Sequence, residues 1–287
     1  MAYLIVVSII WGFSFGLIKG QLTGLPAELV AFIRLLISFL FFLPFFRYEK
    51  RLTPFVPKFL LLGAVQFGGM YIAYISAYRY LMAYQVALFT LLTPIYIVLI
   101  DNLGKAQFNK RAALGAFTAV AASLVIVFRE MPFSDFLTGF ILLQISNLCF
   151  AWGQLYYGKL KNKIPEFSDS RYFALIYLGA VLITFSAALF TRSLQFSAIN
   201  NRQWLTLLYL GLLPSGLGFF WWNFGAARVP AALLAVMNNL KIPLAVLISI
   251  LIFDETASLL RLAAGSALFG LAIYLARFPK FPAVPAE

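Results

Sequence analysis

The sequence predicts an all-α integral membrane protein with ten transmembrane helices, arranged as two inverted five-helix repeats. Of its 287 residues, 63% are hydrophobic and only 11% are charged, whereas soluble domains are about one quarter charged. Ten apolar stretches fit into the chain, each near the ~20 residues that cross a bilayer. They leave room only for short loops, which excludes a soluble enzyme, a disordered chain and a disulfide scaffold.

Breaks in hydropathy place the ten helices in order. We expect them at residues 2–20, 27–46, 58–78, 84–101, 112–128, 137–158, 171–191, 203–224, 231–252 and 259–277. Prolines, which cannot continue a helix, lie at several joins: Pro26, Pro54, Pro57, Pro132, Pro165 and Pro230. The first stretch is a span and not a cleaved leader, because it has no basic start and no small-residue cleavage pattern. The tail 278–287 is expected to be disordered and cytoplasmic.

The net charge of +12 comes from 22 Lys and Arg against 10 Asp and Glu. Arg34 and Lys241 lie within spans. Six more lie in loops on one side of the membrane: Lys19, Arg79, Arg129, Arg192, Arg202 and Arg261. The remaining 14 lie on the other side. Basic residues concentrate in cytoplasmic loops, so both termini are predicted to be cytoplasmic. In this setting the positive charge sets topology and does not indicate nucleic acid as a partner.

The chain repeats part of its own pattern. Two pairs of identical residues are separated by 149 positions: Arg79 with Arg228, and Pro94 with Pro243. Residues 1–128 and 137–277 therefore each hold five spans. Because five is odd, the second copy enters the membrane upside down. Inverted repeats of this kind are typical of secondary transporters, whose substrate lies near the midplane between the repeats.

Ordered motifs carry a resemblance to a known family. The first half contains Trp11-Gly12-Phe13, then Lys19, Pro26 and Arg34. The second half contains Gly216-Leu217-Gly218-Phe219-Phe220-Trp221-Trp222-Asn223, followed by Arg228, Pro230, Pro243 and Asp254-Glu255. In this order the motifs resemble the ten-helix EamA-like branch of the drug/metabolite transporter superfamily. The resemblance implies a ten-helix carrier of small molecules.

One departure from that family pattern concerns the ninth span. Many EamA-like members have an acidic residue just before its proline, whereas this chain has Asn238 and Lys241 there. The segment is more similar to branches that carry nucleotide sugars or organic phosphates, in which a lysine near this place contacts the anionic substrate. The tandem Lys-Arg of the phosphate translocators is missing, because Ile242 follows Lys241.

Lys241 is the most informative residue, because a charge midway through a span costs about 2.5–3.5 kcal/mol on insertion scales. Its ammonium has three donors for an anion. The alternative is a structural lysine held by carbonyls freed around Pro243, or one left neutral by desolvation. Arg34, also within a span, guards the extracellular mouth, binds substrate or bonds to backbone carbonyls of neighbouring helices; the sequence leaves these three roles open.

Pro94 and Pro243 lie in the middle of equivalent helices. Each removes a backbone donor and is expected to leave the carbonyls of Thr90 and Asn239 without their usual partners. Paired interruptions in corresponding spans indicate a transporter site. A kink that only shapes packing is the alternative.

Polar and aromatic stripes complete the predicted site. Tyr71, Tyr74 and Tyr78 share one helix face, and so do Gln144, Asn147 and Gln154; interhelical bonding is the alternative for the amides. The residues predicted to bind substrate are Lys241, Asn238, Arg34, Trp11, Ser14, Tyr74, Tyr78, Thr90, Asn147 and Trp152, with Pro94 and Pro243 as helix breaks. Trp221 and Trp222 are interpreted as interfacial anchors.

The composition also limits the chemistry. There is no histidine, and every acidic residue lies at a span end or in a loop, which argues against a proton/cationic-drug antiporter. We expect no catalytic residue, metal or cofactor. The leading hypothesis is a secondary transporter in the bacterial inner membrane that moves an amino acid, a carboxylate or a related anion by rocking of the two halves. A nucleotide-sugar or organic-phosphate exchanger, an intramembrane lipid enzyme and a channel are the alternatives. The expected partners are the substrate and the bilayer; the oligomeric state is open, a monomer included.

Overall fold

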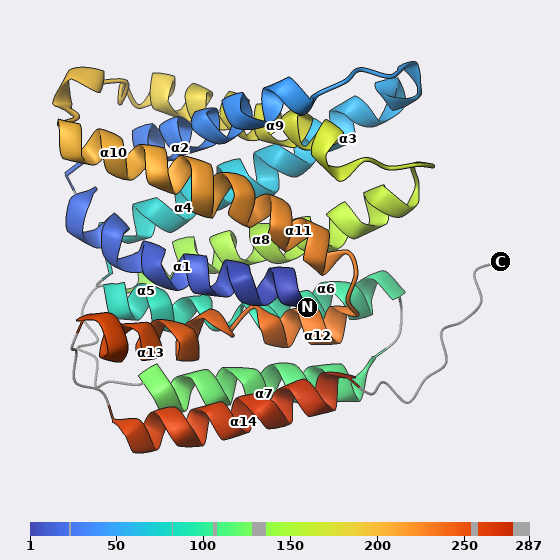
Figure 1. Ribbon diagram of the computed structural model, residues 1–287, viewed down its shortest axis with the longest axis vertical. Coiled ribbons are helices and arrows are strands. Elements are labelled where there is room, and N and C mark those ends of the chain that lie inside the picture. The colour runs from blue at the N-terminus through green and yellow to red at the C-terminus, as the bar shows by residue number, and fades with distance from the viewer. Residues whose placement is uncertain (23, 82, 106–107, 128–135, 254–257, 278–287) are drawn as a thin grey trace.

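In the computed structural model, the described residues are 1–22, 24–81, 83–105, 108–127, 136–253 and 258–277, and they form helices and no strand (Figure 1). The predicted tail 278–287 and Asp254-Glu255 lie outside this part of the chain. The α-helices are α1 Ala2–Gln21, α2 Ala27–Phe42, α3 Val56–Gly63, α4 Met70–Ala77, α5 Ala83–Thr90, α6 Thr93–Lys105, α7 Lys110–Val127, α8 Leu137–Asn162, α9 Asp169–Phe190, α10 Asn201–Leu210, α11 Gly218–Ala226, α12 Ala231–Met237, α13 Lys241–Phe253 and α14 Leu259–Arg277.

These helices confirm the ten predicted spans over the described residues. Four spans consist of two helices each: α3 with α4, α5 with α6, α10 with α11, and α12 with α13. Six segments are long and apolar enough to cross a membrane on length and composition alone, and shorter apolar segments lie at Ala2–Ser14 and Ala231–Leu247. The predicted span ends agree with the observed ones to within about four residues, the uncertainty expected of helix boundaries.

The third and eighth spans both contain a π-helical segment. Ala64–Gly69 joins α3 to α4, and Gly211–Leu217 joins α10 to α11. The second segment contains Pro214, which has no amide hydrogen to donate. Side chains from other spans bond to its carbonyls: Trp11 donates to Pro214, Tyr177 donates to Ser215 and Gly216, and Ser38 donates to Gly211. Wide turns of this kind recur at functional sites in helices.

The fourth and ninth spans are broken at corresponding places. Leu91 and Leu92 separate α5 from α6, and a three-residue turn at 238–240 separates α12 from α13. Pro94 and Pro243 lie just after these breaks, in the first turn of the helix that follows, where a missing amide donor is tolerated. The two prolines thus lie beside interruptions at corresponding places in the two spans.

The outer helices pack in two groups. In Figure 1, α7 and α14 lie side by side at one edge, and α2, α3 and α9 pack together at the opposite edge. The α3–α9 crossing is very close, because a Cβ added at Gly63 would lie 1.6 Å from the carbonyl oxygen of Ile176. At Gly179 an added Cβ would lie 2.0 Å from the carbonyl oxygen of Leu60. Glycine is required at both positions.

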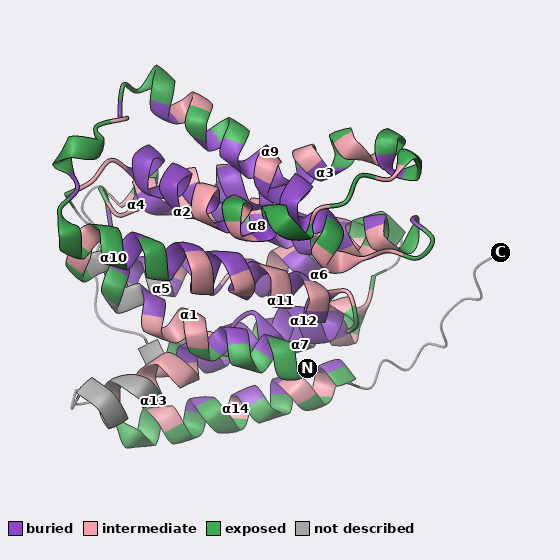
Figure 2. Cartoon of the chain, turned by 45° about the horizontal axis from the view of Figure 1, so that its top comes forward, coloured by how far each residue is buried: buried purple, intermediate pink, exposed green. Residues whose placement is uncertain are grey.

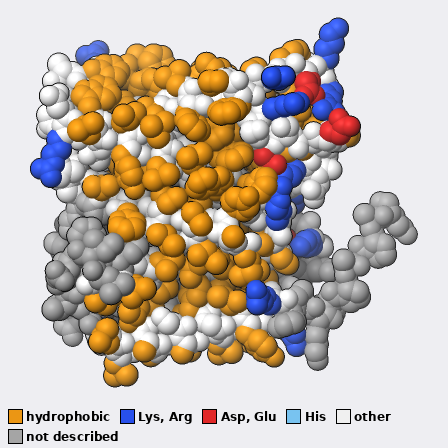
Figure 3. Space-filling view, in the orientation of Figure 1, with side chains coloured by type: hydrophobic (Ala, Val, Ile, Leu, Met, Phe, Trp, Pro, Cys, Tyr) orange, Lys and Arg blue, Asp and Glu red, His pale blue; other side chains and the backbone are white. Residues whose placement is uncertain are grey.

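Burial and surface character follow the expected membrane pattern. Helices α2, α4 and α12 are largely buried, whereas α14 is largely exposed (Figure 2). Hydrophobic side chains cover the face seen in Figure 3, and most charged side chains on that face gather at one end, where α3 begins and α8 ends. An apolar belt with charges at its edge is the surface that a bilayer requires.

Candidate functional site

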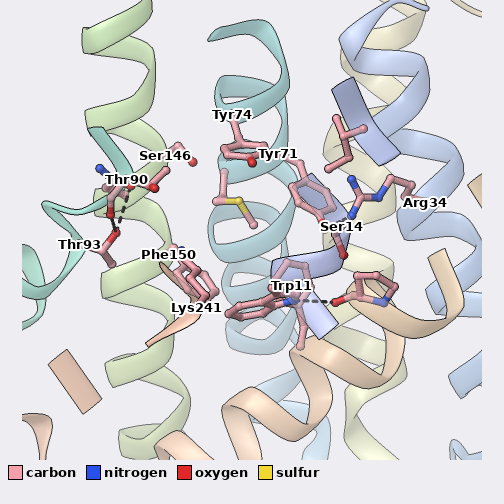
Figure 4. Close-up of a pocket in the computed structure, with 15 residues that line it drawn as sticks. Trp11, Ser14, Arg34, Tyr71, Tyr74, Thr90, Thr93, Ser146, Phe150 and Lys241 are labelled. Atoms are coloured by element: carbon pink, nitrogen blue, oxygen red, sulfur yellow. Dashed lines mark hydrogen bonds between the residues drawn. The ribbon is translucent and has the colours of Figure 1, made fainter. Parts of the chain in front are cut away.

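A pocket lies at the centre of the described structure, where the interrupted spans meet α1, α2 and α8 (Figure 4). Its lining combines two cations, several hydroxyl groups and aromatic rings: Trp11, Ser14, Ile18, Arg34, Met70, Tyr71, Tyr74, Thr90, Thr93, Ser146, Asn147, Phe150, Pro214, Phe219 and Lys241. No residue of the described lining is acidic. A pocket of this composition favours a ligand with a negative group and an apolar body.

Arg34 forms one end of the pocket. Only 2% of the residue is exposed, and its Nε donates to Ser215 Oγ at 3.2 Å. Its Nη2 donates to Tyr71 Oη at 2.6 Å, and its guanidinium carbon lies 4.5 Å from the centre of the Tyr71 ring. Nη1 has no hydrogen-bond partner among the described residues. The guanidinium is thus held in place by neutral groups, and its Nη1 is left to donate to a ligand.

Lys241 is the first residue of α13, immediately after the break in the ninth span. Its Nζ lies 6.0 Å from the centre of the Trp11 ring. Within the described part of the chain it has no salt bridge and no hydrogen bond to a freed carbonyl. The structure therefore gives no support to the alternative of a lysine held by the carbonyls around Pro243.

The carbonyls of Thr90 and Asn239 lack their usual amide partners, as predicted, because residues 94 and 243 are prolines, but other donors take their place. Thr93 Oγ1 donates to the Thr90 carbonyl at 2.8 Å, and the backbone N–H of Ile242 donates to the Asn239 carbonyl at 3.0 Å. The Asn239 side chain donates across to the Leu91 carbonyl at 3.0 Å, which joins the two breaks directly. Each helix break is short, so nearby donors can replace the helical hydrogen bonds that are lost there.

A neutral, hydrogen-bonding wall lies opposite Arg34 in Figure 4. Asn147 Nδ2 donates to the Phe89 carbonyl at 2.9 Å, and Asn147 Oδ1 lies 3.1 Å from Thr93 Oγ1. Ser146 is buried beside them and lines the pocket. We call Thr90, Thr93, Ser146 and Asn147 the hydroxyl–amide wall. It offers donors and acceptors without charge.

Aromatic rings separate this wall from Arg34. The indole of Trp11 is fixed by a hydrogen bond from Nε1 to the Pro214 carbonyl, 3.0 Å long. Its ring lies 5.8 Å from Phe150 and 5.6 Å from Phe219, both edge to face. We call Trp11 and Phe150 the aromatic floor. Rigid rings of this kind pack the apolar part of a ligand.

The structure brings seven of the ten predicted binding residues to this pocket: Lys241, Arg34, Trp11, Ser14, Tyr74, Thr90 and Asn147. The other three do not line it. Tyr78 forms a 2.9 Å hydroxyl pair with Tyr74, Trp152 stacks on Tyr156 at 4.6 Å, and Asn238 bonds to Gln154.

Other residues were missed or misplaced by sequence reasoning. Phe150, Phe219 and Pro214 line the pocket, but apolar residues in apolar helices carry no signal of their own. Ser215, which fixes Arg34, lies within the π-helical segment. The interpretation of Trp222 as an interfacial anchor is wrong: it is fully buried, and its indole donates to Gln154 Oε1 at 2.8 Å.

Ion pairs between loops lie at the end of the molecule where α3 and α9 begin. Glu49 accepts from Arg51 at 2.5 Å and from Arg171 at 3.3 Å, and Arg51 also pairs with Glu166 at 3.1 Å. The hydrogen bond from Arg51 lowers the pKa of Glu49, with Arg171 adding to the effect. These exposed pairs connect the loop after α2 to the loop before α9, and each contributes little to stability.

A buried pocket between discontinuous membrane helices, with unpaired cations and no acidic lining, defines a membrane carrier for a small molecule. The chain belongs to the EamA-like transporter family, whose model matches residues 1–128 and 137–278. It is therefore a transporter, integral to the membrane, and not an enzyme.

Several known proteins are similar over nearly the whole chain. A probable biotin transporter of Pseudomonas aeruginosa is 38% identical over 96% of this chain and 97% of its own length. A biotin transporter of Escherichia coli K12 is 35% identical over 89% of this chain and 85% of its own length. One solved structure, described as "Crystal structure of protein", aligns over 95% of this chain and 95% of its own length. The TM-score is 0.74 and the sequence identity is 16%, which shows that the two chains share a fold. The spans and these bacterial relatives indicate an inner-membrane protein.

Proposed function

We propose that this protein moves a small monocarboxylate of the biotin type across the inner membrane by alternating access, with Arg34 and Lys241 as the cations that bind the carboxylate. The observation that carries the proposal is the presence of both cations in one pocket whose described lining has no acidic residue. The names of the two relatives support the same class of substrate.

Each chemical group of such a substrate has suitable partners among the residues that line the pocket. Biotin combines a carboxylate on an aliphatic chain with a neutral ureido ring. The carboxylate suits the cations, the aliphatic chain suits the rings of Trp11 and Phe150, and the ureido group suits the hydroxyl–amide wall. An amino acid fits less well, because its ammonium would need an anionic partner that the described lining lacks.

The orientation and the repeat structure form part of the proposal. The excess of Lys and Arg in the loops at one end supports cytoplasmic termini. The matching positions of the two π-helical segments and of the two helix breaks support inverted five-helix repeats over residues 1–128 and 137–277.

Counterflow in proteoliposomes tests the function. Vesicles loaded with unlabelled biotin should accumulate external labelled biotin transiently and saturably, which a channel does not do. External unlabelled biotin should compete, whereas biotinamide, whose carboxylate is replaced by a neutral amide, should compete roughly 10-fold to 100-fold less well, because hydrogen bonds to charged groups contribute ~1.5–3 kcal/mol. Absence of counterflow, or equal competition by biotinamide, would contradict the proposal.

A further inference from the structure

A second polar cluster is buried behind the aromatic floor. It consists of Gln66, Gln154, Asn223 and Asn238, which we call the amide cluster, and at most 1% of each is exposed. Gln154 Oε1 accepts from Trp222 Nε1 at 2.8 Å and from Asn238 Nδ2 at 3.0 Å. Gln66 Nε2 donates to Asn223 Oδ1 at 2.9 Å. Two pairs of uncharged amides are thus buried in the interior, Gln66 with Asn223 from the third and eighth spans and Gln154 with Asn238 from the sixth and ninth; Trp222, which bonds to Gln154, directly precedes Asn223 in the sequence.

The aromatic floor separates this cluster from the pocket. Trp11 lines the pocket on one side and lies 4.7 Å, ring to ring, from Trp222 on the other. Phe150 also lines the pocket, and its carbonyl accepts from Gln154 Nε2 at 3.1 Å. Along α8, Gln154 lies one helical turn beyond Phe150, toward the end that the charge count predicts to be cytoplasmic. The cluster is therefore the next polar group below the floor on that side.

Two atoms of the cluster have no hydrogen-bond partner within the described part of the chain. Gln66 Oε1 is an acceptor without a donor, and Asn223 Nδ2 is a donor without an acceptor, and both atoms are buried. The oxygen and nitrogen of a side-chain amide can be assigned the other way round. If both Gln66 and Asn223 are turned in this way, they still bond to each other, and one donor and one acceptor are still unpaired. Buried polar side chains in folded proteins nearly always find partners, so an unpaired pair requires an explanation.

Gln66 cannot correct this by rotating onto another group. Its side chain lies directly on the backbone of α8 at Gly153, where an added Cβ would be 2.3 Å from Gln66 Cβ and Cγ. Gln66 also lies within the π-helical segment Ala64–Gly69. The unpaired carbonyl is thus held in position by packing against Gly153 and by the hydrogen bond to Asn223. A role in bonding two helices together does not explain why the rigidly held amide of Gln66 has an acceptor without a donor.

We propose that the amide cluster is a second binding station, which takes the neutral amide or urea group of the substrate once the aromatic floor opens. This inference rests on the proposed function. A urea or amide carries an N–H donor beside a carbonyl acceptor. Its N–H would bond to Gln66 Oε1, and its carbonyl would accept from Asn223 Nδ2, so the two unpaired atoms match one group of this class. The substrate would pass from the pocket to this station on the way to the cytoplasmic side.

A double substitution separates this role from a purely structural one. Gln66→Met with Asn223→Leu replaces both amides by apolar side chains of similar shape. Because both partners are removed together, the midpoint of thermal unfolding should stay at or above that of the wild type. Biotin binding to the purified protein, measured by its thermal shift, should change less than twofold, whereas biotin counterflow should fall at least tenfold. The matched control, Ser123→Ala with Thr184→Val, removes two buried hydroxyls that bond only within their own helices and should leave counterflow unchanged.

Wild-type counterflow in the folded double variant would overturn the second station while leaving the proposed function intact. If the double variant does not fold, Asn223→Asp keeps the shape and the acceptor for Gln66 but removes the donor. Counterflow should then fall at least tenfold, and unchanged counterflow would overturn the inference. A wild type without biotin counterflow would overturn the proposed function and the station together.

Discussion

The break in the first half and the break in the second half interrupt equivalent spans but place different side chains at the pocket. At the first break, hydroxyl and amide groups bond to the freed carbonyls, as Thr93 does to Thr90 and Asn147 to Phe89. At the second break, Asn238 bonds back to the Leu234 carbonyl, and the next helix begins with Lys241. The same backbone interruption thus presents neutral groups in one half and a charge in the other.

This difference shows how a repeated fold can build an asymmetric site. An inverted duplication yields two similar helix ends, but a substrate with one charged and one neutral end needs two unlike surfaces. Substitution of a few residues around each break is sufficient to supply them. The hydrogen bond from Asn239 to Leu91 holds the two surfaces at a fixed separation.

The largest expected effect comes from removing the charge at the second break. Lys241→Ala should reduce biotin counterflow by roughly 10-fold to 100-fold, the loss expected for one charged hydrogen bond of ~1.5–3 kcal/mol. The elution volume and the midpoint of thermal unfolding should match those of the wild type, because no protein group in the described structure depends on this ammonium. Lys105→Ala removes an exposed lysine paired with Asp101 and should leave counterflow unchanged. Full activity of Lys241→Ala would show that the two breaks do not differ in function.

A smaller effect is expected from cutting the link between the breaks. Asn239→Ala leaves the buried Leu91 carbonyl without a donor, which should destabilise the protein by about 1–3 kcal/mol. Thermal unfolding followed by tryptophan fluorescence should show a midpoint several degrees lower. Thr118→Ala removes a hydroxyl that bonds only to Leu114 in its own exposed helix and should leave the midpoint unchanged. Equal midpoints for both variants would mean that the link contributes nothing to holding the breaks together.

The smallest effect on transport is expected from cysteines introduced near the ends of the two broken spans. Labelling these cysteines tests whether the fourth and ninth spans run in opposite directions. In a Cys149→Ala background, cysteines introduced as Lys105→Cys and Ser258→Cys should both preserve counterflow. In intact cells a membrane-impermeant maleimide should label residue 258 but not residue 105. Labelling of both from the same side would show that the fourth and ninth spans run in the same direction, contrary to inverted repeats.

The sequence was sufficient to predict the helices and their breaks, because both depend on local chemistry. Apolar length places each span in the bilayer, and Pro94 and Pro243 cannot donate within a helix. Lys241 and Arg34 could also be assigned to the pocket, because an intramembrane charge has few other places to lie.

The rest of the site depends on which turn of a helix faces the pocket. Tyr74 and Tyr78 share a face, but the pocket is shorter than the stripe, so Tyr78 lies beyond it and bonds to Tyr74. The dipeptide Trp11-Gly12 recurs in the second half as Trp152-Gly153. Trp11 lines the pocket, but Trp152 stacks on Tyr156, and Phe150 of the same helix lines the pocket instead. Interhelical bonds such as Gln154 with Asn238 join residues 84 positions apart, and no local pattern reveals them.

The crossing of α3 and α9 limits which parts of the molecule can move. Gly63 and Gly179 bring the two backbones into direct contact, without side chains that could change rotamer to let one helix slide past the other. Helix α3 comes from the first half of the sequence and α9 from the second. We therefore expect α3 and α9 to stay together during transport, so that the parts that move against each other combine helices from both halves of the sequence, unlike the rocking of the two halves expected from the sequence.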